Sequence, residues 1–297
     1  MSVKLGIAPI AWSNDDMPEL GGDTPIEKCL EETKVSGFSG IELGGKFPRN
    51  PGITNFLLKK FQLSMPGGWY GAFLRKRSAD EEWAAMQDHL HLLKIVKADV
   101  FIFADVSSSI QGEPHTPLAN RPTLNGNEWK LYAKKLSDLS NRLHDEGMPM
   151  SYHEHMGTII QTEEDVDKLM NETNDKTFLL YDTGHLLFAQ ANYENILKKY
   201  ISRINHVHCK DIRKNILDIA LDKNKSFRDS FLDGVFTVPG DGCIDYIPLL
   251  KTLKENNYDK WLVIEAEQDP KKANPLEYAK IGNKYLTGIM DEVGYKI

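Results

Sequence analysis

The sequence predicts an α/β protein whose fold is a (β/α)8 TIM barrel. Short apolar runs alternate with amphipathic segments of helical period, which is typical of βαβ units around a parallel sheet. Four of the later runs end in motifs rich in His, Asp and Glu, as expected where barrel strands converge on one site. The 297 residues suit one barrel, and the sequence shows no linker or internal repeat. We therefore expect residues 1–297 to form a single domain.

The first half of the chain supplies four strands and the helices between them. Thr24 and Pro25 have the character of an N-cap and a first helical position, and Gly37 that of a helix end. Ser78 and Glu81 form a capping-box pattern before a further helix. An apolar stripe indicates that helix: Trp83, Met86, Leu90 and Leu93. The strands are expected at 3–9, 40–43, 61–66, which has the weakest pattern, and 99–103.

The second half supplies the other four strands, expected at 149–153, 177–182, 203–209 and 261–265. Gly147 should end the preceding helix, Thr162 should cap the next one, and a last helix should span about 275–290. Two long connections, 104–126 and 212–244, follow strands and should therefore lie on the catalytic face. They form a lid over the site, or else surface decoration or oligomer contacts.

Composition narrows the classes of partner. A net charge of -7 disfavours a nucleic-acid binder, because such proteins usually carry a basic face. The three cysteines form no C-x-x-C pair, so a reducing, cytoplasmic setting is expected. No apolar run approaches the ~20 residues of a membrane helix, and no glycine-rich nucleotide motif is present. We expect a small-molecule partner, no nucleic acid and no membrane, and leave homo-oligomer formation open.

Four short motifs carry the chemistry. They are Tyr152-His153-Glu154-His155, Asp182-Thr183-Gly184-His185, His206-Val207-His208-Cys209-Lys210-Asp211 and Glu265-Ala266-Glu267. Because side chains alternate across a strand, His153 and His155 should share one face, with Glu154 on the other. In the third motif, the residues expected to point inward are His206, His208 and Lys210, opposite Cys209.

Each motif alone has an ordinary explanation, such as a structural His pair, a helix cap at Asp182 or salt-bridged carboxylates at a rim. Their position at the ends of consecutive predicted strands favours one shared metal site instead. Histidine and carboxylate ligands without thiolate suit Mn²⁺, Co²⁺, Fe²⁺ or Zn²⁺. The sequence therefore predicts a divalent metal centre.

The order of these motifs resembles that of the xylose-isomerase-like barrel superfamily, which includes ketose epimerases, inosose-handling enzymes and endonuclease IV. Longer phrases are similar to the inosose dehydratase family of inositol catabolism, and the likeness spans residues 4 to about 290. Those phrases lie at 6–16, 152–158, 236–245 and 263–270.

The resemblance implies metal-dependent dehydration of 2-keto-myo-inositol (scyllo-inosose), a cyclic polyol ketone, to a trihydroxycyclohexane-1,2-dione. The alternative is an inosose isomerase or ketose 3-epimerase with the same metal site. Mn or Co is the expected cofactor, followed by Zn or Fe. The implied ligands are Asp182, His208, Glu265 and His155, with His153 as the alternative to His155. The implied acid, base or substrate contacts are His153, His185 and Lys210, and the implied pocket lining is Glu42 and Trp69.

Two positions depart from the family pattern or vary within it. The family often carries Lys where this chain has Gly68, so if that Lys binds substrate, this protein should prefer a related polyol ketone. The middle position of Tyr-His-x-His varies, which disfavours Glu154 as a ligand, although the superfamily usually places a Glu on this strand. Two further classes stay open: an abasic-site endonuclease, and a non-catalytic sugar-binding barrel.

Overall fold

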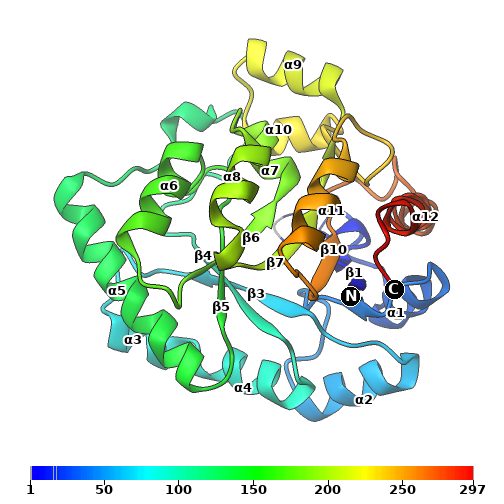
Figure 1. The fold of residues 1–297 in the computed structure, drawn as a ribbon, viewed down its shortest axis with the longest axis horizontal. Coiled ribbons are helices and arrows are strands. Elements are labelled where there is room, and N and C mark those ends of the chain that lie inside the picture. The colour runs from blue at the N-terminus through cyan, green and yellow to red at the C-terminus, as the bar shows by residue number, and fades with distance from the viewer. Residues whose placement is uncertain (1, 16, 18, 297) are drawn as a thin grey trace.

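Eight parallel strands form a barrel ringed by helices in the computed structural model, which describes residues 2–15, 17 and 19–296 (Figure 1). The strands are hydrogen-bonded in the order β2-β1-β10-β7-β6-β5-β4-β3. Parallel bridges from Gly40 to Ser64 and from Leu43 to Gly68 then join β2 to the β3 side, so the sheet closes on itself. The predicted α/β barrel is confirmed.

The barrel strands are β1 (Lys4–Ile7), β2 (Gly40–Ile41), β3 (Gly67–Ala72), β4 (Val100–Asp105), β5 (Met150–His153), β6 (Phe178–Asp182), β7 (Ile204–Cys209) and β10 (Trp261–Ile264). A separate antiparallel pair consists of β8 (Asp211–Ile212) and β9 (Phe236–Thr237). The α-helices are α1 (Ile26–Val35), α2 (Pro51–Phe61), α3 (Ala79–Ala85), α4 (Gln87–Val96), α5 (Gly126–Asp145), α6 (Glu163–Glu172), α7 (Thr183–Phe188), α8 (Tyr193–Tyr200), α9 (Lys214–Asp222), α10 (Phe227–Leu232), α11 (Tyr246–Glu255) and α12 (Pro275–Val293).

One strand lies elsewhere than predicted. Residues 61–66 contain the end of α2 and the approach to β3, and the strand itself is the glycine-rich Gly67–Ala72. Glycine is depleted in strands because it offers no side chain to pack, so the sequence pattern is weak here. Close neighbours exclude larger residues: a Cβ at Gly67 would lie 2.9 Å from Cγ2 of Val100.

Most of the sequence signals for the starts and ends of helices agree with the structure. The capping box at Ser78 and the N-cap at Thr162 are confirmed, and Gly147 has the left-handed φ of +73° expected just beyond a helix. The prediction that Thr24 is the N-cap of this helix is wrong. Helix α1 begins at Ile26, and its N-cap residue is Pro25, whose side chain makes no capping hydrogen bond. The apolar stripe from Trp83 to Leu93 predicted one helix. In the structure it spans two helices, α3 and α4, which meet at Met86.

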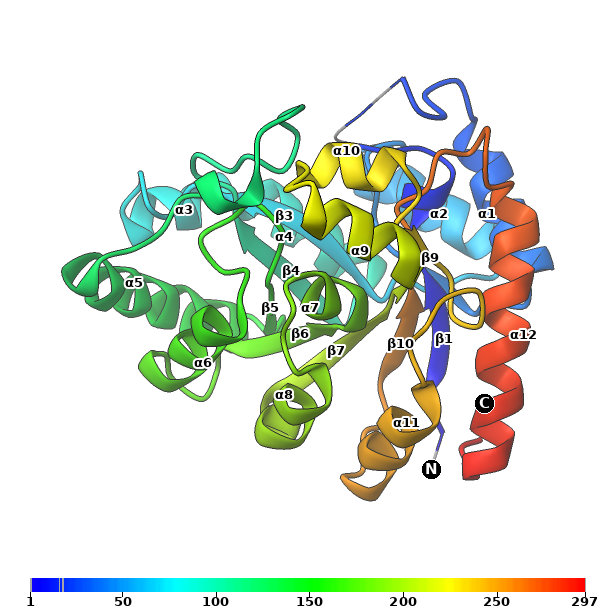
Figure 2. The same cartoon turned by 90° about the horizontal axis from the view of Figure 1, so that it is seen from above.

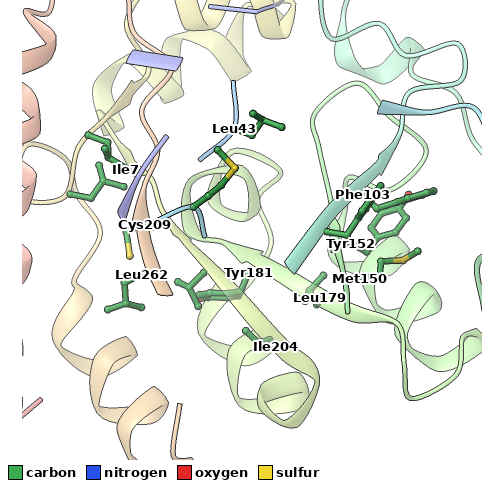
Figure 3. Packing of buried hydrophobic residues seen from close by; sticks show 14 of the residues in the cluster. Ile7, Leu43, Phe103, Met150, Tyr152, Leu179, Tyr181, Ile204, Cys209 and Leu262 are labelled. Atoms are coloured by element: carbon green, nitrogen blue, oxygen red, sulfur yellow. The ribbon is translucent and has the colours of Figure 1, made fainter. Parts of the chain in front are cut away.

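The main apolar core lies between the strands and the surrounding helices. Figure 3 shows side chains of this layer, including Ile7 of β1, Tyr181 of β6 and Leu262 of β10. Cys209 also belongs to it, as strand alternation predicted for a residue opposite His208. Because the outward faces supply the core, inward side chains near the strand ends are free to be polar.

The 212–244 connection folds into a cover of α9, α10 and the β8–β9 pair. Figure 2 shows α9 and α10 together on the side of the barrel toward which β1 runs from the N-terminus. A second apolar cluster joins the cover to the barrel: Met17, Met156, Phe188, Ile212, Leu217, Phe227, Phe231, Val235 and Phe236. Within the described ranges, no helix combines the length and apolarity needed to cross a membrane.

Helix α5 offers a matched test of this packing. Leu136, on the face of α5 that packs against the barrel, is fully buried, whereas Leu131 on the same helix is 56% exposed. We expect Leu136→Ala to lower the free energy of unfolding by about 2–5 kcal/mol, because it leaves a cavity. Leu131→Ala should change it by no more than about 0.5 kcal/mol. Urea unfolding followed by circular dichroism checks both, and equal effects would contradict this placement of α5.

Candidate metal and catalytic site

Four predicted site residues converge at the carboxyl ends of the strands. His153, Asp182, His208 and Glu265 each offer a ligand atom, and these atoms all lie within 4.8 Å of one another. Oδ2 of Asp182 is 3.7 Å from Nε2 of His153 and 3.6 Å from Nδ1 of His208. His208 also closely approaches Glu265. Parallel strands explain the meeting, because Asp182 and His208 are direct partners in the β6–β7 register.

The polar atoms of this cluster are buried and incompletely satisfied. Among the residues that the structure describes, both ring nitrogens of His153, Oδ2 of Asp182 and Nδ1 of His208 have no hydrogen-bond partner. Leaving such a group unpaired costs about 1–3 kcal/mol. A divalent cation would satisfy Nε2 of His153, Oδ2 of Asp182 and Nδ1 of His208 together, and nitrogen and carboxylate oxygen are ligands that such cations accept. The donor set therefore fits a metal ion.

Asp182 both caps α7 and faces the proposed metal cluster, two roles that the sequence presented as alternatives. Its Oδ1 accepts a hydrogen bond of 2.9 Å from the backbone N–H of His185 and so caps α7. Its Oδ2 points into the cluster instead. Burial would raise the pKa of Asp182, but His185 and Lys210 lower it below its usual range, so the carboxylate is ionised.

Glu42 orients His208 as well as bordering the pocket. Nε2 of His208 donates to Oε1 of Glu42 over 3.1 Å, and Nε2 of His206 donates to the same oxygen over 2.6 Å. With Nε2 engaged, His208 presents Nδ1 to the cluster, an arrangement common behind metal-ligating histidines. Burial would raise the pKa of Glu42, but His208 and His206 lower it to about 2.

The structure separates the two histidines of the fifth-strand motif. His153 is the last residue of β5, and beyond it strand alternation no longer fixes which way side chains point. His155 lies outside the four-residue cluster and beside His185 and Glu267 instead. The geometry thus favours His153 over His155 as the fourth ligand.

Glu154 does not turn away from the site as alternation predicted. It is fully buried, and its Oε2 lies 3.4 Å from Nδ1 of His153. Burial, followed by the charge of Asp182, raises the pKa of Glu154 well above its ordinary value, so this side chain is a neutral acid. It lies beside His153 and His185 at the edge of the proposed metal cluster.

A second polar group surrounds Lys210. Its ammonium donates to Nε2 of His185 over 2.8 Å and to Oε2 of Glu267 over 2.7 Å. It also lies 3.2 Å from Oε1 of Glu265 and 3.5 Å from Oδ2 of Asp182. Burial would lower the pKa of Lys210, but Asp182, Glu265 and Glu267 raise it above its usual value. Glu267 was not assigned a role from the sequence, although it belongs to the Glu265-Ala266-Glu267 motif.

A pocket in front of these groups is lined by apolar side chains and by polar ones that include Glu42, His155, His208 and Glu267. Trp69 lines it, and its ring centroid lies 5.6 Å from that of His153 and 5.4 Å from that of His155. Asp15 and Gln111 also line it, from loops. Asp15 lies within the 6–16 phrase and Gln111 within the 104–126 connection, but neither was assigned a role from the sequence, because loop geometry brings these particular side chains to the site.

The cover forms an aromatic wall over the polar groups. The ring of Phe227 lies 5.3 Å from that of His155 and 5.8 Å from that of His185, between centroids. The ammonium of Lys210 lies 5.0 Å from the ring of Phe236. Of the two explanations for the 212–244 connection, this geometry favours a covering role. The wall also lowers the local dielectric, which strengthens the charge interactions beneath it.

Gly68 does not face the pocket. A Cβ at this position would meet Cβ of Leu43 at 2.9 Å and Cδ2 of Leu93 at 3.0 Å, in the layer between the barrel and α4. The inward neighbour on β3 is Trp69 instead. The difference from the family pattern at Gly68 therefore gives no support to a change of substrate.

The fold and the strand-end site define the class of the protein. Residues 31–287 match the model of the xylose isomerase-like TIM barrel family, and the chain belongs to that family. Solved structures share its architecture. One is the probable 3-DHS dehydratase AsbF of Bacillus anthracis, with TM-score 0.71 and 14% identity, covering 96% of this chain and 98% of that one. Another is the IolI protein with a zinc atom, with TM-score 0.71 and 16% identity, covering 98% and 99%. At such identities they show the fold alone.

Closer relatives narrow the family further. The inosose dehydratase of Clostridium tetani is 44% identical over 286 residues, covering 96% of both chains. That of Geobacillus thermodenitrificans matches to the same extent. The rhizopine catabolism protein MocC of Rhizobium meliloti is 42% identical over 297 residues, covering 100% of this chain and 91% of its own. The chain thus belongs to the inosose dehydratase family, and the prediction of a hydro-lyase is confirmed at the level of the family.

The glycine of the Asp-Thr-Gly-His motif offers a test of the Lys210 geometry. A Cβ at Gly184 would lie 2.5 Å from Cγ of Lys210, so Gly184→Ala must displace the lysine. Because small displacements of catalytic groups are costly, we expect kcat/KM to fall about 100-fold on the relevant ketone. Gly288→Ala, where a Cβ meets nothing within 4 Å, is the matched control. Unchanged kcat/KM in Gly184→Ala would contradict a role for the position of Lys210.

Proposed function

We propose that this protein dehydrates an inosose, a cyclic polyol ketone, with the aid of one divalent metal ion. The observation that carries the proposal is the buried cluster of His153, Asp182, His208 and Glu265, with its unpaired ligand atoms, beside the charged group around Lys210. The family relatives named inosose dehydratases supply the substrate class. Mn²⁺ or Co²⁺ is the proposed metal, with Zn²⁺ or Fe²⁺ next, and these donors accept each of them.

In this proposal His153 and His155 exchange the roles expected from the sequence. His153 joins Asp182, His208 and Glu265 as the fourth ligand, and His155 moves to the acid–base group. When bound, the metal supplies Lewis acidity that stabilises negative charge on the ketone oxygen and its neighbouring hydroxyl. Glu42 contributes indirectly, by holding His208 in its ligating orientation.

Dehydration then requires a base for the proton next to the ketone and an acid for the departing hydroxyl. His155 suits the base, because burial lowers its pKa to about 4 and leaves it neutral at pH 7. The ammonium of Lys210, fixed between Glu267 and His185, stays charged and suits stabilisation of the departing hydroxyl rather than free release of its own proton. His185 lies between the two and can relay a proton or position the substrate. The aromatic wall excludes water that would compete for these protons.

Several expectations from the sequence stay predictions: a single domain over residues 1–297, a cytoplasmic setting, the absence of nucleic-acid partners, and homo-oligomer formation as an open alternative. The isomerase or epimerase alternative also stays open, since it would use the same metal and the same first proton transfer but would return the proton rather than lose hydroxide.

The product decides between these two reactions. We expect scyllo-inosose, incubated with the metal-loaded enzyme, to give a product lighter by one water that absorbs in the ultraviolet as an enolised dione. Mass spectrometry of the reaction mixture checks this. A product of unchanged mass would instead establish isomerisation. Related cyclic and open-chain ketones serve as competing substrates, because MocC carries a different catabolic name at similar identity.

The exchange of histidine roles is testable by metal content. Asp182→Asn, Glu265→Gln and His153→Gln should each lower metal affinity by at least about tenfold and abolish turnover. His155→Gln should keep the metal and lose turnover. Asp145→Asn, on the exposed end of α5, is the control and should keep both. Metal-binding titration together with steady-state kinetics checks the set, and loss of metal in His155→Gln but not in His153→Gln would reverse the assignment.

A further inference from the structure

We infer that the ammonium of Lys210 occupies a second cation position, and that the enzyme holds one metal ion because this lysine fills the place of another. The latent position is formed by His155, His185 and Glu267, next to the proposed metal cluster. The inference rests on the proposed function, in which that cluster holds a metal ion. It adds a second cation site that the side chain of Lys210 occupies.

The donors around Lys210 are those of a metal site. One ligand atom from each of His155, His185 and Glu267 lies within 4.8 Å of the others, and all three side chains are buried. Nζ of Lys210 lies 2.8 Å from the nitrogen of His185 and 2.7 Å from the oxygen of Glu267. Two imidazoles and a carboxylate, with one position left for water, are a ligand set of catalytic zinc sites.

Glu265 connects the two positions. Its Oε2 approaches His208 in the proposed metal cluster, and its Oε1 lies 3.2 Å from Nζ of Lys210. In sites that hold two metal ions, the ions lie about 3.5–4 Å apart, and a carboxylate placed in this way could bridge them. The geometry is therefore that of a paired site in which an ammonium is one of the two cations.

Charge explains why this position cannot be left empty. Asp182, Glu265 and Glu267 are buried carboxylates that all lie near the ammonium of Lys210, and removing one partner of a buried ion pair is strongly destabilising. Lys210 cannot swing away, because its side chain is fully buried, passes directly over Gly184, and has its backbone N–H bonded to Thr183. The same place, once vacated, offers nitrogen and oxygen donors to a free cation.

Two further groups of candidate ligands share residues with these positions. His153, Glu154 and His185 form one, and two of its members already belong to the positions described above. The group around Glu42 does not make a comparable site either. Glu42, His206 and His208 also lie close together, but one oxygen of Glu42 already accepts hydrogen bonds from both histidines. His208 belongs in addition to the proposed metal cluster. That group is accounted for by its role in orienting His208.

The test is metal stoichiometry of the purified full-length protein. Co²⁺ titration, followed by visible absorption and by elemental analysis after removal of excess metal, should give one equivalent for the wild type and for Lys210→Arg, which keeps the cation. Lys210→Ala should bind two equivalents. Lys210→Ser is a second variant of the same kind, used if Lys210→Ala does not fold as judged by circular dichroism.

Adding Glu267→Gln to Lys210→Ala should weaken the second equivalent by at least about tenfold, as expected for loss of a ligand. One equivalent in both the wild type and the folded lysine variants would overturn this inference and leave the proposed function intact. Two equivalents in the wild type would overturn it as well. No bound metal in the wild type would overturn the proposed function itself.

Discussion

Neutralising buried negative charge is the constraint on which the rest of this site depends. Asp182, Glu265 and Glu267 lie together at the carboxyl end of the barrel, beside the aromatic wall of Phe227 and Phe236. Carboxylates in such a place must be matched by cations or protons. Lys210 matches part of this charge, and a metal ion held by His153 and its neighbours would match more. Gly184, the cap of α7 and the contact of Glu42 with His208 all serve to place those charges.

The sequence predicted the barrel and the strand-end site because both depend on short-range patterns. Asp182, His208 and Glu265 follow or end apolar strands, so their convergence follows from parallel topology alone. The third strand was misplaced because Gly67 and Gly68 pack too closely for side chains that would reveal a strand. The residues that make these contacts lie far apart in the chain, so they leave no local sequence pattern.

The details of the site depended on where elements end and on distant partners. Strand alternation could not distinguish His153 from His155, because β5 ends at His153 and His155 lies beyond it. The role of Glu42 was out of reach because His208 lies 166 residues away. Asp15 and Gln111 are placed by loops. Sequence thus specifies which chemistry is available, whereas tertiary structure decides which side chain performs which part of it.

The packing of Gly184 against Lys210 has an evolutionary consequence. Asp182 caps α7 and faces the proposed metal, and Thr183 bonds the backbone of Lys210. Gly184 leaves room for the aliphatic part of the Lys210 side chain. Positions 184 and 210 are therefore epistatic: a larger residue at 184 is tolerable only beside a shorter one at 210, and the shorter one forfeits the fixed positive charge. Divergence of this barrel toward other ketones is thus freer at the loops that carry Asp15 and Gln111 than along β6 and β7.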